Sequence, residues 1–411
     1  MTGDERIGSL VDGRFRLEER IDAGGLATVW RATDRERGTA VALKCENDGP
    51  HDRAQVRAHF RGELRWFRRF DGGPVPGSLV RFVDGAVGGD TGYVATELIR
   101  GGSLGDLVAR EAEPNRPLPD PLERVRELGG PVCRALAFLH RNGVAHLDLK
   151  PSNVLVRRSG RPAVIDLNAA VATETDPDIC FERDPFKPPE LTLTDARDAP
   201  IGPRCDVYAL GAVLAFLLTG TASAGTAASI GAWEPVDPQS GDADCPSALA
   251  GAIRRATAPD HRDRFDDADE LYDALVPVLE VPNRSARLVH EPSGRTVRVR
   301  PGDTLGRWAA DRRVPTVVLP DDERFCCPEH AVLEHDGSDW RLRDRSLNGT
   351  YVRGDGDWEY VLSRDGCERR RDADAPLPRP DPLASIRLSD GDRIAPVSPE
   401  YGCRLVFRTG D

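Results

Sequence analysis

The interpretation of this chain begins at residues 146–153, which have the sequence His-Leu-Asp-Leu-Lys-Pro-Ser-Asn and form a short polar loop between apolar segments. Residues 163–166, Ala-Val-Ile-Asp, follow and are typical of a strand that ends in a carboxylate. Asp148 can orient and deprotonate a hydroxyl, and Lys150 can neutralise charge on a moving phosphoryl group. Asn153 and Asp166 supply hard oxygen ligands for Mg²⁺. These residue types also crowd ordinary turns, but four complementary roles at this spacing favour phosphoryl transfer.

This pattern resembles the catalytic loop and the metal-binding strand end of eukaryotic-like protein kinases, and Lys two residues after the catalytic Asp is the Ser/Thr-kinase form. The resemblance covers about two-thirds of the chain. It implies a bilobal α+β fold for residues 1–282, with an N-lobe of about 1–98 and a C-lobe of about 99–282. It also implies that Asp148 and Lys150 are catalytic and that Asn153 and Asp166 hold the metal.

Composition supports this interpretation and argues against nucleic acid as a partner. The formal net charge is −12, with 68 acidic and 56 basic residues, so the overall basic footprint of a nucleic-acid-binding protein is absent. Among the basic residues only Lys44, Lys150 and Lys187 are Lys, and all others are Arg. Both positions that the kinase pattern requires as Lys are therefore Lys in a chain that otherwise uses Arg.

Cysteine usage and hydropathy indicate the compartment. The chain has nine cysteines, an odd number, and its N-terminus lacks the features of a signal peptide, so we expect reduced thiols in a cytoplasmic protein. Their spacings match no common zinc finger. Residues 207–218 are apolar, but 12 residues fall short of the roughly 20 that a membrane span requires. We therefore expect a buried helix there and no membrane span.

The N-terminal part carries the residues that, by resemblance, bind ATP. A strand at 14–21 leads into a glycine-containing turn at 22–30, in which Gly24 matches one of the three family glycines and Val29 begins the next strand. Small residues let backbone N–H groups approach phosphate oxygens closely. Asp22 and Ala27 replace the other two glycines, and Asp22 brings a carboxylate near the expected phosphates.

Two further segments complete the expected nucleotide site. Lys44 ends a buried strand at 41–44, and we expect it to hold the α- and β-phosphates while pairing with Glu63. Glu63 lies in a segment of helical character, residues 53–70. The resemblance also identifies the end of a strand at 93–98 as the hinge, where backbone groups of Glu97 and Ile99 would face adenine.

The C-terminal part of this region retains the family framework with some departures. We expect Glu190 to pair with Arg264, and Asp206 to hold the backbone of the catalytic loop from below. Residues 121–141 show helical periodicity interrupted by Gly-Gly-Pro at 129–131, which predicts a kink.

Three further departures from the family pattern lie in this C-terminal part. Leu147 replaces the Arg that normally receives an activation-segment phosphate, which argues against control by phosphorylation of Thr173 or Thr175. Asn168 stands where the family has Gly. Arg183 stands where the family has a Thr that touches the catalytic Asp, so the geometry for a peptide substrate is open.

Beyond a short linker at 281–283, the pattern changes to alternating strands broken by Gly, Asp and Pro turns, which predicts an all-β sandwich. Motifs in this part are Leu-Gly-Arg at 305–307, Cys-Pro-Glu-His at 327–330, Ser-Leu-Asn-Gly-Thr at 346–350 and Asp-Gly-Asp-Arg-Ile at 390–394. Their order resembles a forkhead-associated (FHA) domain, a phosphothreonine-reading module, over residues 283–411.

The FHA resemblance implies four peptide-binding residues. Arg307 would bind the phosphate, Asn348 would hold the peptide backbone, and His330 would brace the loops. Cys327 occupies the position of a phosphate-binding Ser, and a thiol is a weaker donor than a hydroxyl. Leu347 replaces a Thr. We also interpret residues 354–387 as a long insertion that forms a mobile loop and an interaction site.

The sequence therefore predicts a Ser/Thr protein kinase that transfers the ATP γ-phosphoryl group to protein hydroxyls, using Mg²⁺ with Mn²⁺ as an alternative. The FHA-like domain would bind a phosphothreonine peptide or a phospho-independent partner. Two alternatives remain open: a pseudokinase scaffold without catalysis, which the departures favour, and a small-molecule phosphotransferase of related fold. The complete set of catalytic residues opposes the first, and Lys150, Glu190, Asp206 and Arg264 oppose the second.

Overall fold

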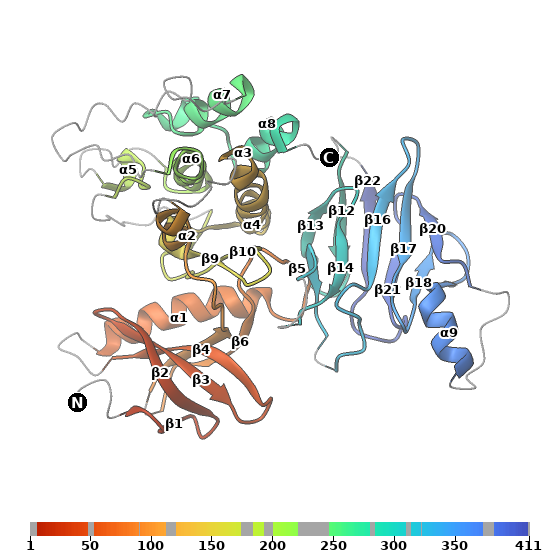
Figure 1. Ribbon diagram of the computed structural model, residues 1–411, viewed down its shortest axis with the longest axis horizontal. Coiled ribbons are helices and arrows are strands. Elements are labelled where there is room, and N and C mark those ends of the chain that lie inside the picture. The colour runs from red at the N-terminus through yellow and green to blue at the C-terminus, as the bar shows by residue number, and fades with distance from the viewer. Residues whose placement is uncertain are drawn as a thin grey trace.

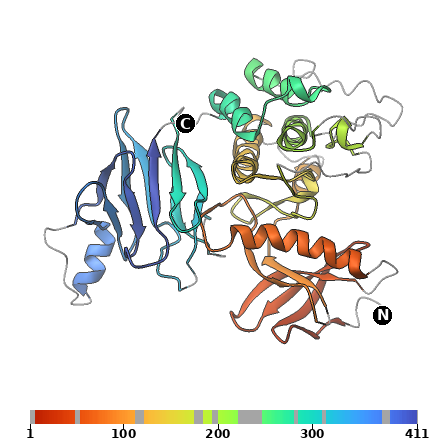
Figure 2. The same cartoon turned by 180° about the vertical axis from the view of Figure 1, so that it is seen from behind.

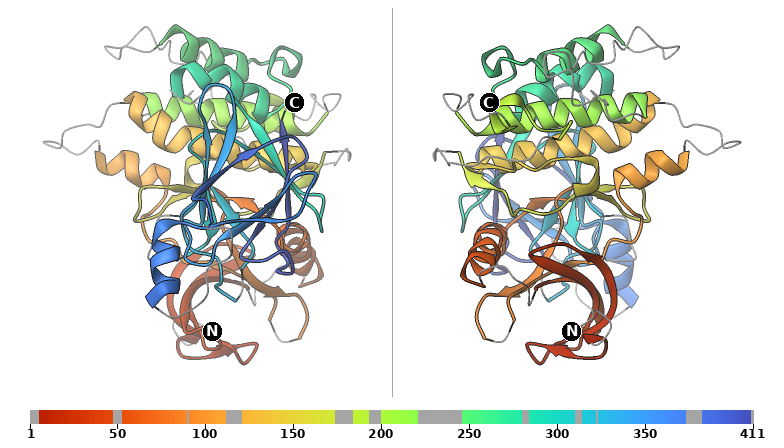
Figure 3. Two further views of the ribbon diagram at one scale, coloured as in Figure 1. Left: turned by 90° about the vertical axis from the view of Figure 1, so that its right-hand side faces the viewer. Right: turned by 90° about the vertical axis from the view of Figure 1, so that its left-hand side faces the viewer.

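The computed structural model describes residues 6–47, 53–89, 91–111, 121–173, 184–192, 200–220, 246–279, 284–309, 314–321, 323–372 and 382–409. Three parts are visible in Figure 1: a twisted sheet with one long helix, a group of helices above it, and a β-sandwich beside both. Figure 2 gives the same arrangement from behind, and Figure 3 shows the sandwich facing both lobes. The predicted bilobal α+β fold followed by an all-β sandwich is confirmed.

The first sheet has the antiparallel order β1-β2-β3-β4-β7-β6. Its strands are β1 (Leu10–Val11), β2 (Phe15–Ala23), β3 (Ala27–Asp34), β4 (Thr39–Glu46), β6 (Phe82–Ala86) and β7 (Tyr93–Glu97). Helix α1 (Arg53–Phe70) lies against this sheet, with the bounds predicted from the sequence. Buried side chains recur every three or four residues along α1, which explains why a segment rich in Arg still packs on one face: Val56, Phe60, Glu63, Leu64, Trp66, Phe67 and Phe70.

The second lobe is mainly helical. Its helices are α2 (Leu104–Glu111), α3 (Pro121–Arg124), α4 (Gly130–Arg141), α5 (Pro189–Thr192), α6 (Pro203–Thr219), α7 (Ser247–Ala256) and α8 (Ala268–Leu279). Short strands and single turns connect them: β8 (Val144–Ala145), β9 (Val154–Val156), β10 (Pro162–Val164), β11 (Val171–Ala172), and the 3₁₀ turns Pro151–Asn153 and His261–Asp263.

Two features of these helices were anticipated. The segment with Gly-Gly-Pro contains a π-helical turn, Val125–Gly129, directly before α4, where Pro131 cannot donate a backbone hydrogen bond. The apolar stretch at 207–218 lies in α6, which is buried on nearly all sides. Among the described residues, no helix combines the length and apolar character needed to cross a membrane.

The β-sandwich consists of two six-stranded sheets, ordered β13-β12-β22-β21-β18-β19 and β20-β17-β16-β14-β15-β5. Their strands are β5 (Val75–Pro76), β12 (Ala286–His290), β13 (Thr296–Val299), β14 (Thr304–Arg307), β15 (Val317–Leu319), β16 (Ala331–His335), β17 (Trp340–Asp344), β18 (Thr350–Arg353), β19 (Glu359–Val361), β20 (Ser385–Leu388), β21 (Arg393–Pro396) and β22 (Leu405–Thr409). Strand β5 comes from the segment between α1 and β6, so the first lobe contributes an edge strand to the sandwich.

One prediction for the sandwich was wrong. Residues 354–387 are not simply a mobile loop, because they include β19, helix α9 (Arg364–Asp372) and most of β20. Both strands pair within the two sheets, and Gly366 packs against Leu362 and Ser346 so closely that a Cβ would clash. The proline-rich part at 373–381 and the linker at 281–283 lie outside the described residues.

Candidate active site

Lys44 connects three elements at the junction of the two lobes. Its Nζ lies 3.1 Å from Glu63 Oε2 on α1 and 3.1 Å from Asp166 Oδ1, which follows β10. The expected Lys44–Glu63 ion pair is therefore present. Burial would lower the pKa of Lys44, but the carboxylates of Glu63 and Asp166 raise it above its ordinary value. Burial raises the pKa of Glu63 to about 7, although Lys44 opposes that shift.

Asp166 is held in an unusual backbone conformation. Its φ is 65°, a left-handed value that costs a non-glycine residue about 1 kcal/mol or more, and it therefore points to a functional constraint. The backbone N–H of Asn168 donates to Asp166 Oδ1 at 3.3 Å. The indole Nε1 of Trp66 on α1 donates to Ala170 O at 2.9 Å, which ties the helix to the segment after Asp166.

Asp148 is surrounded by donors. Asn153 Nδ2 lies 2.8 Å from Asp148 Oδ2 and 2.7 Å from the Asp148 carbonyl oxygen, and Lys150 Nζ lies 3.3 Å from Oδ2. Lys187 Nζ donates to Oδ1 and, at 3.0 Å, to Leu147 O. Burial would raise the pKa of Asp148, but Lys187 and the neighbouring cations hold it below its usual range. The carboxylate is thus kept ionised at neutral pH.

Sequence reasoning missed Lys187. It lies just before α5, 37 positions after Lys150, and its side chain is 7% exposed. The signal was nevertheless present, because the chain has only three lysines. The structure brings all three to the same group of carboxylates: Lys44 to Asp166, and Lys150 and Lys187 to Asp148.

The loop that carries Asp148 is fixed from below by Asp206 on α6, as predicted. Asp206 accepts hydrogen bonds from the backbone N–H groups of His146 at 2.6 Å and Leu147 at 2.7 Å, and its Oδ2 lies 2.9 Å from His140 Nε2. Leu147 is buried with a φ of 61°. It packs with Ala145, Leu191 and Cys205, so an apolar contact replaces the family's phosphate-binding Arg.

A second predicted framework contact is also confirmed. Arg264 donates to Glu190 through two nitrogens, at 2.6 and 3.0 Å, and both side chains are almost fully buried. The remaining donors of Arg264 reach the carbonyl oxygens of Arg204, Ala258 and Pro259. Buried charges require this degree of satisfaction, because a lone buried ion is strongly destabilising. Thr175, a candidate site of regulatory phosphorylation, and Arg183, which differs from the family pattern, lie outside the described residues.

The residues expected around the nucleotide lie on the strands of the first sheet or directly beside them. Gly24 lies at the β2–β3 turn, where its N–H donates to Ala27 O at 2.9 Å and its carbonyl accepts from Asn47 at 2.7 Å. Val29 is directly opposite Lys44 in the β3–β4 register, so the two side chains share a face. Glu97 turns its side chain away from that face, and Ile99 follows β7.

The predicted peptide-binding residues meet at the loops of the sandwich. Arg307 ends β14, and its Nη1 donates to Trp308 O at 3.2 Å. His330 is buried, with its ring nitrogens 3.2 Å from Cys327 N and 3.0 Å from Gly349 O, so it braces two loops as expected. Cys327 Sγ accepts from the Leu347 N–H at 3.3 Å, and Asn348 Nδ2 donates to Phe325 O at 2.7 Å. Within the described residues, no group of three or more His, Cys, Asp or Glu side chains is arranged to hold a metal.

Comparisons with known proteins agree with this geometry. The family model described as "Protein kinase domain" matches residues 15–230, and the model described as "FHA domain" matches residues 295–367. The chain is 30% identical over 294 residues to the serine/threonine-protein kinase PknL of Mycobacterium tuberculosis, covering 68% of this chain and 69% of that protein. It is 28% identical over 330 residues to PknA of the same organism, covering 75% and 73%.

A more distant relative extends the comparison. A probable serine/threonine-protein kinase of Clostridium acetobutylicum is 26% identical over 275 residues, which cover 66% of this chain and 40% of that protein. The kinase model spans more than half of the chain, and the chain spans more than two-thirds of PknL. The chain therefore belongs to the protein kinase family, as an ATP-dependent Ser/Thr protein kinase with a C-terminal FHA domain.

Proposed function

We propose that Asp148, Lys150, Asn153 and Asp166 transfer the γ-phosphoryl group of ATP to Ser or Thr hydroxyls of protein substrates, with Mg²⁺ as the metal and Mn²⁺ as an alternative. The observation that carries this proposal is the continuous polar network from Glu63 through Lys44 to Asp166, beside Asp148 and its three donors. A scaffold without catalysis would not require this network, because well-packed apolar residues can replace a whole set of buried ion pairs with little loss of stability.

The residues present fit a divalent cation. The Asn153 amide nitrogen is committed to Asp148, so its oxygen is the atom suited to a metal. Asp166 uses Oδ1 for Lys44, which leaves Oδ2 as a second hard donor. When bound, the metal neutralises developing charge on the β- and γ-phosphates.

The chain's own residues then have distinct tasks. Asp148 accepts the hydroxyl proton, and its lowered pKa keeps it ionised for that role. Lys44 holds the α- and β-phosphates and is oriented by Glu63, while Lys150 offsets charge on the transferred group. Gly24, Val29 and the hinge backbone at Glu97 and Ile99 enclose the nucleotide.

The proposal extends to the second domain and to the compartment. We assign residues 1–282 to the kinase domain and 283–411 to the FHA domain, in which Arg307, Cys327, His330 and Asn348 bind a phosphothreonine peptide. The described cysteines are all free thiols, which supports a cytoplasmic protein.

One experiment separates the proposed activity from its alternatives. The purified chain is incubated with labelled ATP and Mg²⁺ or Mn²⁺, alone and with a general protein acceptor. Label entering protein, lost in the Asp148→Asn and Lys44→Met variants, supports the proposal. Absence of turnover with folded protein contradicts it in favour of a scaffold, and label confined to a small acceptor contradicts it in favour of a small-molecule kinase.

A further inference from the structure

Arg295 of the FHA domain caps a helix of the kinase domain. It precedes β13, yet its guanidinium donates to the carbonyl oxygens of Arg69 and Phe70 and, at 3.3 Å, to that of Asp71. Arg69 and Phe70 are the last residues of α1, and Asp71 follows the helix directly. Arg295 is 5% exposed. These three hydrogen bonds all go to backbone carbonyls, so the contact serves the helix end rather than an ion pair.

The chemistry of a helix end explains this arrangement. The last four carbonyls of a helix lack partners within the helix, and the macrodipole makes that end favourable for a cation. A guanidinium is planar and has five N–H donors, so one side chain can serve several carbonyls at once. Burial and the neighbouring Arg69 lower the pKa of Arg295 to about 10, so it remains charged at neutral pH.

The kinase side is shaped to admit this side chain. A Cβ on Gly73 would lie 2.5 Å from Arg295 Nη1 and 3.2 Å from His290 Nδ1. A Cβ on Gly77 would lie 2.1 Å from Pro315 O. Between these glycines, Val75 pairs with Val318 and Pro76 with Val317, and Pro76 is tolerated because β5 is the edge strand of its sheet. The close approach of two backbones therefore requires glycine at 77, and glycine at 73 leaves the space that the Arg295 guanidinium occupies.

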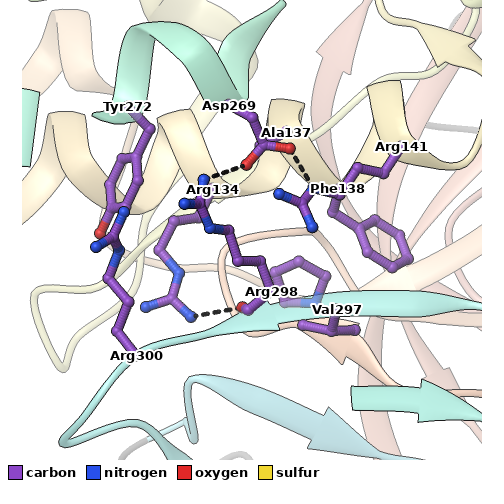
Figure 4. Close-up of a pocket in the computed structure, with 10 residues that line it drawn as sticks. Arg134, Ala137, Phe138, Arg141, Asp269, Tyr272, Val297, Arg298 and Arg300 are labelled. Atoms are coloured by element: carbon purple, nitrogen blue, oxygen red, sulfur yellow. Dashed lines mark hydrogen bonds and ion pairs between the residues drawn. The ribbon is translucent and has the colours of Figure 1, made fainter. Parts of the chain in front are cut away.

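Further contacts fix the FHA domain to the second lobe. Arg134 on α4 binds Asp303 through two hydrogen bonds of 2.7 and 2.6 Å. Arg298 and Arg300 bind Asp273 on α8 at 2.9 and 2.7 Å. Figure 4 shows Arg134, Arg298 and Arg300 converging on the space between α4, α8 and β13. The FHA domain thus contacts α1 of the first lobe while ion pairs fix it to α4 and α8 of the second lobe.

A contact at the hinge adds to this arrangement. Trp308, next to the candidate phosphate-binding residue Arg307, donates through Nε1 to Glu97 Oε2 at 3.1 Å. Glu97 also binds Arg157 through two hydrogen bonds of 3.0 and 2.6 Å. The FHA domain therefore contacts the N-lobe at the end of α1 and at the end of β7.

We propose that Arg295 is a positioning residue for the kinase reaction: by capping α1, the FHA domain holds Glu63 against Lys44. Glu63 lies two turns before the capped end on the same helix, and both it and the cap are buried. Leu147 removes the family's means of fixing the active state through a phosphorylated segment, and the cap acts continuously in its place. This proposal rests on the proposed roles of Lys44 and Glu63.

The first test is the Arg295→Ala variant of the full chain. We expect kcat/KM for ATP to fall roughly tenfold or more, since three hydrogen bonds to a helix end are lost, and amide hydrogen exchange in residues 63–73 to accelerate. Arg343→Ala is the matched control, because Arg343 forms an exposed pair with Glu334 on β16, away from α1. An Arg295→Ala variant with wild-type kcat/KM for ATP would overturn the proposal.

A second variant reaches the same contact from the kinase side. Gly73→Ala places a methyl group against the Arg295 guanidinium and should reproduce the loss without altering the FHA domain. Gly62→Ala, in α1 itself, has nothing within 4 Å of the added Cβ and should leave activity unchanged. Equal activity of both alanine variants would contradict the proposal even if Arg295→Ala failed to fold.

The decisive readout is coupling to Glu63. In a Glu63→Gln background, Arg295→Ala should cause no further loss, because the group that it positions is gone. The same fold loss in both backgrounds would show that Arg295 acts elsewhere and would refute the positioning role. Binding of a fluorescent ATP analogue gives the same comparison without turnover, so failure of the proposed kinase activity remains distinguishable from failure of this inference.

Discussion

The candidate active site of the kinase domain and the candidate peptide-binding loops of the FHA domain are organised by different forces. Around Asp148 and Lys44, contacts join full charges of opposite sign that come from separate elements. Around Arg307, the contacts are mainly neutral: Cys327 accepts from a backbone N–H, and Asn348 donates to a backbone carbonyl. The first site therefore depends on charge, whereas the second depends on loop shape.

This difference indicates how well each site tolerates the substitution of a residue. A buried charge that loses its partner destabilises the fold, so the active-site network is interdependent. A neutral hydrogen bond contributes only about 0.5–1.5 kcal/mol, so Cys327 and Leu347 can replace a hydroxyl-bearing pair while the loops keep their geometry. Five experiments, ordered by expected effect, sharpen or break this comparison.

The largest effect is expected for Asp148→Asn. The amide cannot accept a proton, so the rate of phosphoryl transfer should fall by about 10²- to 10⁴-fold, measured with labelled ATP and a protein acceptor. Asp355→Asn, in an exposed turn of the FHA domain, is the matched control and should retain full activity. Transfer within a few-fold of wild type by Asp148→Asn would show that the charge network is not the catalytic site.

Arg307→Ala tests the other side of the comparison. If Arg307 binds phosphate, its loss should weaken binding of a phosphothreonine peptide by roughly 10- to 100-fold, since charge-assisted hydrogen bonds contribute about 1.5–3 kcal/mol. Fluorescence anisotropy with the full chain measures this change, and the unphosphorylated peptide is the control. Equal binding of both peptides by the wild-type chain would exclude phosphothreonine reading at these loops.

The pH dependence of ATP use tests the Lys44–Glu63 pair. Because burial raises the pKa of Glu63 to about 7, its charged form is lost as pH falls through 7, and kcat/KM for ATP should drop about fivefold between pH 7 and 6. Glu63→Gln should be less active and lack this acidic limb. A wild-type profile that is flat over this range would contradict the assignment.

The same shift has a defined effect on stability. Between the ordinary pKa of 4.5 and the raised value of about 7, the folded state binds more protons at Glu63 than the unfolded state. The contribution of this group to the free energy of unfolding is therefore full below 4.5 and decreases as pH rises through 7. Denaturant unfolding of wild type and Glu63→Gln at several pH values measures the difference.

The smallest effect is expected for Cys327→Ser. A hydroxyl is a better donor than a thiol, so the variant should bind a phosphothreonine peptide about 3- to 10-fold more tightly, the worth of one neutral hydrogen bond. Cys367→Ser on α9 is the matched control. Unchanged or weaker binding by Cys327→Ser would mean that position 327 does not face the phosphate.

Local patterns predicted much of this molecule correctly. The bounds of α1 followed from its periodicity, and the Lys44–Glu63 and Glu190–Arg264 pairs followed from family motifs. Lys187 was missed because its contact with Asp148 spans 39 positions and belongs to no short motif. The segment around α9 was mistaken for a loop because its charged residues are typical of exposed segments. The sequence gives no sign that Gly366 packs closely within the domain.

The amino-acid sequence by itself determined the two folds and the candidate residues for phosphoryl transfer, because periodicity and motif spacing are local properties of a chain. Only the tertiary structure decided that the FHA domain contributes Arg295 to α1 and Trp308 to the hinge, and receives β5 from the kinase. Those contacts join residues more than 200 positions apart in the chain. No local pattern encodes them, because they depend on how two folded surfaces satisfy each other's hydrogen-bonding groups.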